Sequence, residues 1–130
     1  MKYNGCIIEE SLKDVSILSD FTIIRTNIEK VTEKHATPKL DVWTMHIVEI
    51  DEERVEECVL KLSEAIDGSG ANGAWYTDLK CEDYHYIIFA GKVFKVDRTK
   101  PEQYEETKRY GIEHGIPEHQ LPNRYWAKAN

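Results

Sequence analysis

Only two segments of this chain have the hydrophobic period of an α-helix, and each follows a group of short apolar runs. The first segment starts after Asp51, which is expected to be its N-cap, and Gly68 is expected to end it in a left-handed conformation. Its small and aliphatic side chains recur at the spacing of one buried stripe. They are Val55, Cys58, Val59, Leu62, Ala65 and Ile66.

The second helical segment begins near Pro101, a residue that is tolerated in the first turn of a helix. It is expected to end at Gly115. Ile116 is the apolar follower and Pro117 the stop of a Schellman-type ending.

The remaining apolar runs are short and rich in β-branched or aromatic residues, which predicts strands. They occupy residues 5–11, 21–31, 41–50, 74–80 and 84–97, and the last divides at Gly91. The run 41–50 is apolar at both sets of alternating positions, which predicts a strand covered on both faces for part of its length. The order of strands, helix, strands, helix predicts an α+β fold, a mostly antiparallel sheet of about five or six strands with two helices packed on one face.

Length and composition favour one globular domain. The 130 residues, of which 41% are hydrophobic and 32% charged, suit a single domain 1–130 with a real core, and we expect the tail 117–130 to be irregular. No apolar run reaches the roughly 20 residues of a membrane helix. The cysteines are odd in number and form no C-x-x-C pair, which favours reduced thiols and a cytoplasmic location.

The acidic balance bears on partners. A net charge of −7 argues against a nucleic-acid-binding protein, because phosphate contacts need a concentrated surplus of Lys and Arg. No membrane partner is expected either.

The stretch DGSGANG at residues 67–73 contains the letters of the dinucleotide-binding fingerprint G-x-G-x-x-G. That fingerprint works where a strand enters the glycine turn and a helix leaves it, because the helix N-terminus then binds the pyrophosphate. Here the order is reversed, and the helix end and Asp67 both bring negative charge. The stretch is therefore interpreted as a connector, and no nucleotide cofactor is expected.

Polar and aromatic side chains of the predicted strands form the candidate ligand-binding set. Its members are Trp75, Tyr76, Asp78, His85, His46 and Glu49. Aromatic side chains can wall a pocket for a small ligand, although they more often fill a core or a subunit interface. The carboxylates and imidazoles suit acid–base chemistry or zinc, but their spacing matches no zinc signature, so neither a metal nor another cofactor is expected.

Two functional hypotheses remain open. The first is a non-enzymatic module that self-associates as a homodimer, or binds a protein or small molecule, through an aromatic-bearing sheet face. The alternative is a small enzyme, with or without an assisting metal, that uses a carboxylate and histidine cleft. The residues leave open whether the protein is an enzyme.

Three motifs carry a resemblance to a known group. They are the strand W-Y-x-D at residues 75–78, Y-x-I-F-x-x-K-V-F at residues 86–94 and G-x-x-x-G-I-P at residues 111–117. With them the chain resembles a group of small uncharacterised prokaryotic proteins between Ser11 and Leu121. The group carries no established activity, cofactor or catalytic residue, so the resemblance implies no function.

Overall fold

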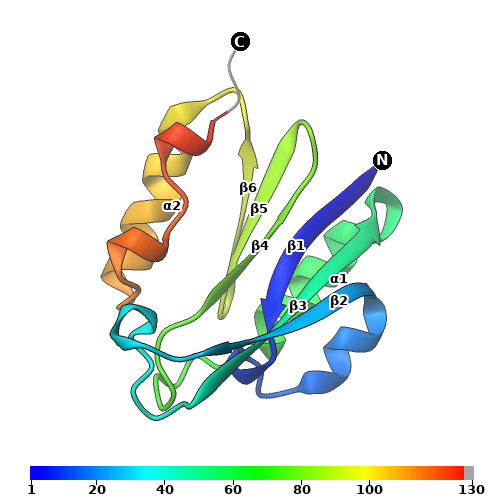
Figure 1. The fold of residues 1–130 in the computed structure, drawn as a ribbon. Helices are drawn as coiled ribbons and strands as arrows, with labels where there is room; N and C mark the ends of the chain where they lie inside the picture. Colours follow the sequence, from blue (N-terminus) through cyan, green and yellow to red (C-terminus); the bar gives the residue numbers. More distant parts are fainter. Residues whose placement is uncertain (128–130) are drawn as a thin grey trace.

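The computed structural model describes residues 1–127 and forms its six strands into one continuous sheet (Figure 1). The strands are β1 (Lys2–Ile8), β2 (Thr22–Lys30), β3 (Val42–Asp51), β4 (Tyr76–Lys80), β5 (Tyr84–Phe89) and β6 (Lys92–Asp97). Their order across the sheet is β2-β3-β1-β4-β5-β6, and every neighbouring pair is antiparallel. The predicted α+β class and antiparallel sheet are confirmed.

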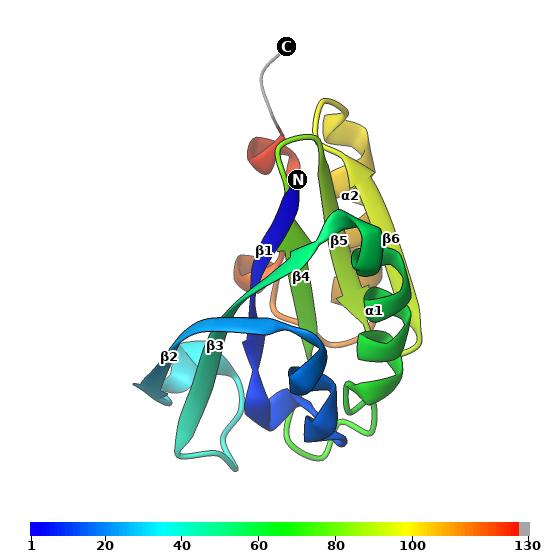
Figure 2. The same ribbon diagram turned by 90° about the vertical axis from the view of Figure 1, so that its right-hand side faces the viewer.

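The two main helices are α1 (Glu52–Ala65) and α2 (Pro101–Glu113), and they pack on opposite faces of the sheet (Figures 1 and 2). On β5, Tyr86 and Ile88 join the core beneath α1, whereas Ile87 and Phe89 join the core beneath α2. The prediction that both helices share one face is therefore wrong. Because successive side chains of a strand point to opposite faces, a strand as apolar as β5 needs cover on both sides.

The predicted stripe of α1 is buried against the sheet as expected, but the predicted end of the helix is wrong. Gly68 does not take a left-handed conformation; the helix ends at Ala65, and Ile66 is extended and 1% exposed in the core. The backbone of Ile66 bridges to Leu12. Burial of Ile66 therefore pulls the chain out of the helix before the glycines are reached.

The end of α2 matches the prediction. Gly115 has a φ of 89°, the amide of Ile116 donates to the carbonyl of Gly111 at 3.0 Å, and the amide of Gly115 donates to Ile112 at 3.1 Å. These are the two hydrogen bonds of a Schellman ending, which satisfy carbonyls that the last helical turn leaves free.

Five short 3₁₀ helices complete the described chain. They are η1 (Glu9–Ser11), η2 (Val15–Asp20), η3 (Glu33–His35), η4 (Glu118–Gln120) and η5 (Arg124–Trp126). In the predicted irregular tail, the side-chain amide of Gln120 donates to the carbonyl of Lys34 at 2.9 Å and that of His35 at 3.1 Å. The tail therefore ties α2 to the loop before β3. Among the described residues, neither α1 nor α2 has the length and apolar composition of a membrane-spanning helix.

The α2 side of the sheet is covered on only one half. The sheet residues of the core beneath α2 belong to β4, β5 and β6, and none of them belongs to β2 or β3. The face of β3 that carries Trp43, Met45 and Ile47 is half-buried, so this strand is covered only in part on the α2 side, in line with the expected cover on both faces for part of its length. This partly open face is where the candidate site lies.

Candidate functional site

A pocket of about 240 Å³ lies between the open part of the sheet and η4. Three neighbouring strands build it because their side chains alternate in the same phase: Cys6 of β1 lies opposite both Ile47 of β3 and Asp78 of β4. The side chains that define its character are Cys6, Ile8, Trp43, Met45, Tyr76 and Asp78. The walls are mostly apolar, and a carboxylate lies at one side.

Asp78 is held by a buried hydrogen-bonded chain that ends on α2. Nε2 of His85 lies 2.5 Å from Oδ2 of Asp78, and Nδ1 of His85 lies 2.9 Å from the hydroxyl of Tyr104. His85 is 0% exposed, whereas 27% of the Asp78 side chain is exposed. One neutral tautomer satisfies all three groups, because Nε2–H donates to the carboxylate and the hydroxyl of Tyr104 donates to Nδ1.

The surroundings of this chain keep it in that arrangement. Burial raises the pKa of Tyr104, although the guanidinium of Arg98 acts in the opposite direction, so the hydroxyl keeps its proton near neutral pH. The ring of Trp126, from η5, lies over His85 with a centroid distance of 5.8 Å and an interplanar angle of 10°. The tail therefore shields the imidazole, and only Asp78 reaches the pocket.

The other titratable side chains of the pocket stay neutral. Burial, followed by the negative charges of Asp78 and Glu29, raises the pKa of the Cys6 thiol to about 11. Burial and then Asp78 also raise the pKa of Tyr76, whose hydroxyl donates to the carbonyl of Gln120. Cys6 is therefore a poor nucleophile near neutral pH, because the thiolate is the reactive form.

Two indole rings close one end of the pocket. Trp43 and Trp75 have ring centroids 5.4 Å apart at an interplanar angle of 55°. The indole N–H of Trp43 donates to the hydroxyl of Thr37 at 3.0 Å. The indole N–H of Trp75 is buried and, within residues 1–127, donates to no acceptor. The rings therefore supply flat apolar surface, and of their two N–H donors only that of Trp75 is left without an acceptor.

The structure brings together some of the candidate residues and separates others. Tyr76, Asp78 and His85 lie side by side, and Trp75 lies against Trp43 at one end of the pocket. His46 points to the α1 side of the sheet, where its ring nitrogens lie 3.0 Å from Glu9 and 2.8 Å from Thr26. Glu49 lies at the far end of β3 beside the Nζ of Lys2, 3.0 Å away.

Two residues that matter here were not among the candidates. Tyr104 was hidden because it occupies a position of the buried stripe of α2, where an aromatic residue signals packing. Cys6 lies in a short apolar run, where an unpaired cysteine usually packs as a small apolar residue. Its raised pKa agrees with that role, although its side chain lines the pocket.

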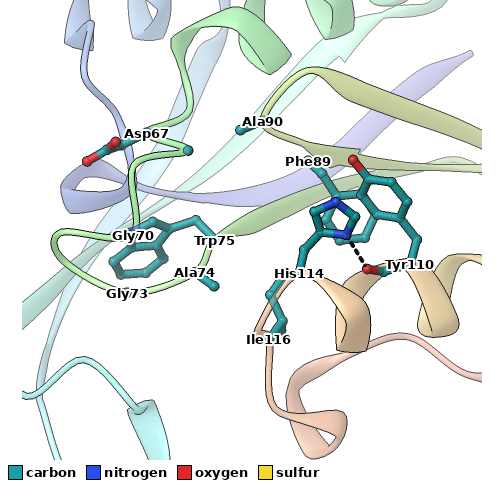
Figure 3. Close-up of a pocket in the computed structure, with 11 residues that line it drawn as sticks. Asp67, Gly70, Gly73, Ala74, Trp75, Phe89, Ala90, Tyr110, His114 and Ile116 are labelled. Atoms are coloured by element: carbon teal, nitrogen blue, oxygen red, sulfur yellow. Dashed lines mark hydrogen bonds between the residues drawn. The ribbon is translucent and has the colours of Figure 1, made fainter.

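A second pocket, of about 140 Å³, lies between the glycine-rich stretch and the end of α2 (Figure 3). Phe89, Tyr110 and His114 form one wall, and Nδ1 of His114 lies 2.7 Å from the carbonyl of Tyr110. The carboxylate of Asp67 accepts the amide of Ser69 at 2.8 Å and points away from these rings. Backbone and hydroxyl donors of Ser69 lower the pKa of Asp67, so negative charge stays beside the glycines and disfavours phosphate.

Within the part of the chain that the structure describes, no group of three or more His, Cys, Asp or Glu side chains is placed to hold a metal ion. Comparison of the chain with protein-family models, with curated proteins and with solved structures finds no match. The functional argument therefore depends on the geometry of the Asp78 pocket.

Proposed function

We propose that this protein is a binding module for a small planar molecule that carries a cationic or N–H-donating group, and that the molecule binds in the Asp78 pocket. The observation that carries the proposal is a partly exposed carboxylate, fixed from behind by His85, at the side of an aromatic-walled hollow. Pockets of this composition, apolar with a few placed polar groups, are typical of small-ligand sites.

The carboxylate favours a ligand that donates hydrogen bonds. One oxygen of Asp78 accepts from His85, and an ionised carboxyl offers about four acceptor positions in all. Filling the pocket with an apolar molecule would strip water from the carboxylate without replacing its hydrogen bonds. A cation or N–H group in that place offsets the loss of water, and its charge-assisted hydrogen bond is worth about 1.5–3 kcal/mol.

The walls favour a flat and small ligand. Trp43, Tyr76 and Met45 offer ring faces and a thioether, which pack well against planar groups and attract cations. The volume of about 240 Å³ lies below the roughly 300–1,000 Å³ of drug-sized sites. A single substituted ring is the expected size.

The enzyme alternative has weaker support. Asp78 with His85 and Tyr104 behind it has the geometry of an oriented general base. A second acid–base group facing the same space is missing from the described lining, because Cys6 keeps its proton and the hydroxyl of Tyr76 is engaged by Gln120. Binding therefore accounts for the arrangement with fewer requirements than catalysis.

Isothermal titration with three probes of the same shape tests the proposal. Benzamidine is cationic, benzamide is neutral and benzoate is anionic, so affinity should fall in that order. Asp78→Asn keeps the shape of the side chain and removes its charge, and it should weaken benzamidine binding by about 10- to 100-fold. His46→Gln, on the other face of the sheet, is the matched control and should change nothing.

The proposal fails if benzoate binds as well as benzamidine, if none of the three probes binds, or if Asp78→Asn and His46→Gln have equal effects.

A further inference from the structure

The strand β2 is an uncovered edge of the sheet. It is the terminal strand in the sheet order (Figure 2). All nine of its residues are exposed, on both faces of the strand. Three of them are isoleucines, Ile23, Ile24 and Ile28, which are 43%, 55% and 70% exposed. An edge strand of this length and apolar content is a template for pairing with another chain.

A β-bulge limits the regular part of this edge. The pairing of β2 with β3 shifts register between Ile23 and Arg25 and then continues evenly to Lys30. A bulge disrupts the ladder locally, so a second strand has the regular stretch Arg25–Lys30 to pair with.

We infer that the occupant of this edge is a second copy of the chain, whose β2 pairs antiparallel around a two-fold axis at Asn27. In this register Arg25 of each copy lies opposite Glu29 of the other, and Thr26 lies opposite Ile28. Directly opposed side chains are about 4.5–5.5 Å apart at Cβ, which lets both oppositely charged pairs form. The two sheets then join into one.

Charge complementarity selects this register over its neighbours. Two residues that face each other across an antiparallel pair point their N–H and C=O groups either both toward the partner strand or both away from it. Because this direction alternates from residue to residue, a two-fold axis passes through a residue and not between two residues. An axis at Thr26 places Arg25 opposite Asn27 and puts the bulge into the ladder. An axis at Ile28 places Glu29 opposite Asn27. Only the axis at Asn27 pairs unlike charges within the regular stretch.

The side chain of Glu29 is positioned to take part. It is 52% exposed, and one of its oxygens lies 3.2 Å from Nε2 of His35. The contact with His35 uses one carboxylate oxygen, and the other is available to an arginine. Charged residues on an edge strand can instead serve to keep other chains away. The two roles predict opposite results for the oligomeric state.

Light scattering coupled to size-exclusion chromatography, over a concentration series, tests the inference. The wild type should reach twice the chain mass of 15.1 kDa. Arg25→Glu converts both unlike pairs into like pairs and should weaken dimerisation by about tenfold or more. The double variant Arg25→Glu/Glu29→Arg restores unlike pairs and should dimerise again.

Lys30→Glu is the matched control. It makes the same change of net charge on the same strand, but in the inferred register Lys30 faces Ile24, so dimerisation should persist. Circular dichroism of each variant establishes that the fold is intact. A wild type that is monomeric throughout the series overturns the inference. So does a dimer that Arg25→Glu weakens no more than Lys30→Glu, or a double variant that stays monomeric.

Discussion

Tyr104→Phe removes a single oxygen from the buried hydrogen-bonded chain behind Asp78. The phenyl ring of the variant fills the same space, so no cavity forms around the fully buried residue. The variant instead removes the hydroxyl that lies 2.9 Å from Nδ1 of His85, so this ring nitrogen loses its hydrogen-bond donor. His85 is itself fully buried, so water does not replace the lost hydroxyl.

The cost follows from leaving a buried acceptor without a partner. Such a group costs about 1–3 kcal/mol, which is more than the net value of an ordinary hydrogen bond. For a domain of this size, each kcal/mol corresponds to a fall of about 3–5 °C in Tm. We expect Tyr104→Phe to lower the free energy of unfolding by about 1–3 kcal/mol and to lower Tm accordingly.

Urea denaturation followed by circular dichroism measures the effect. Tyr84→Phe is the matched control, because it removes the same atom from a ring that is 39% exposed beneath Nζ of Lys95. The control should change the free energy of unfolding by less than about 0.5 kcal/mol. If Tyr104→Phe changes the free energy of unfolding as little as Tyr84→Phe does, the hydroxyl does not hold His85. The reasoning about the buried hydrogen-bonded chain is then refuted.

Two further predictions concern the strand β1. Because the pKa of Cys6 is raised from 9.0 to about 11, the rate at which iodoacetamide labels it should still rise about tenfold per pH unit between pH 9 and pH 10. Peptide mass spectrometry measures this rate. A labelling rate that levels off by pH 9 contradicts the assigned burial of the thiol. Gly5→Ala places a Cβ 2.0 Å from the backbone carbonyl oxygen of Asp78, which must push β1 and β4 apart. We therefore expect urea denaturation to show a loss of about 3 kcal/mol or more in the free energy of unfolding. A loss below about 0.5 kcal/mol would show that the two strands separate freely.

Local patterns predicted the elements well where local interactions decide them. The stripe of α1 and the Schellman ending at Gly115 follow from side-chain spacing and from the left-handed conformation that glycine tolerates. The prediction that α1 ends at Gly68 was wrong because burial of Ile66 against the core sets the end of the helix, and this is a tertiary effect. The same limit applies to the helix faces, because the spacing in the sequence does not say which side of the sheet a helix crosses.

The site was predictable only in part. Asp78 and His85 lie on strands joined by a short hairpin, so their proximity follows from local pairing. Tyr104 and Cys6 come from distant segments, and nothing local places them there. His46 was grouped with Asp78 without knowledge of the strand register. The register assigns even-numbered β3 residues to the α1 side of the sheet. His46, for example, lies opposite Ile7, which belongs to the core beneath α1.

The most direct test of the Asp78 pocket is a titration of ¹⁵N-labelled protein with benzamidine, followed by amide chemical shifts. We expect the largest changes at Cys6, Tyr76 and Asp78, and no change near His46 or at Gly70 in the glycine-rich stretch. Changes centred on Gly70 and His114, or spread evenly over both faces of the sheet, would contradict the account.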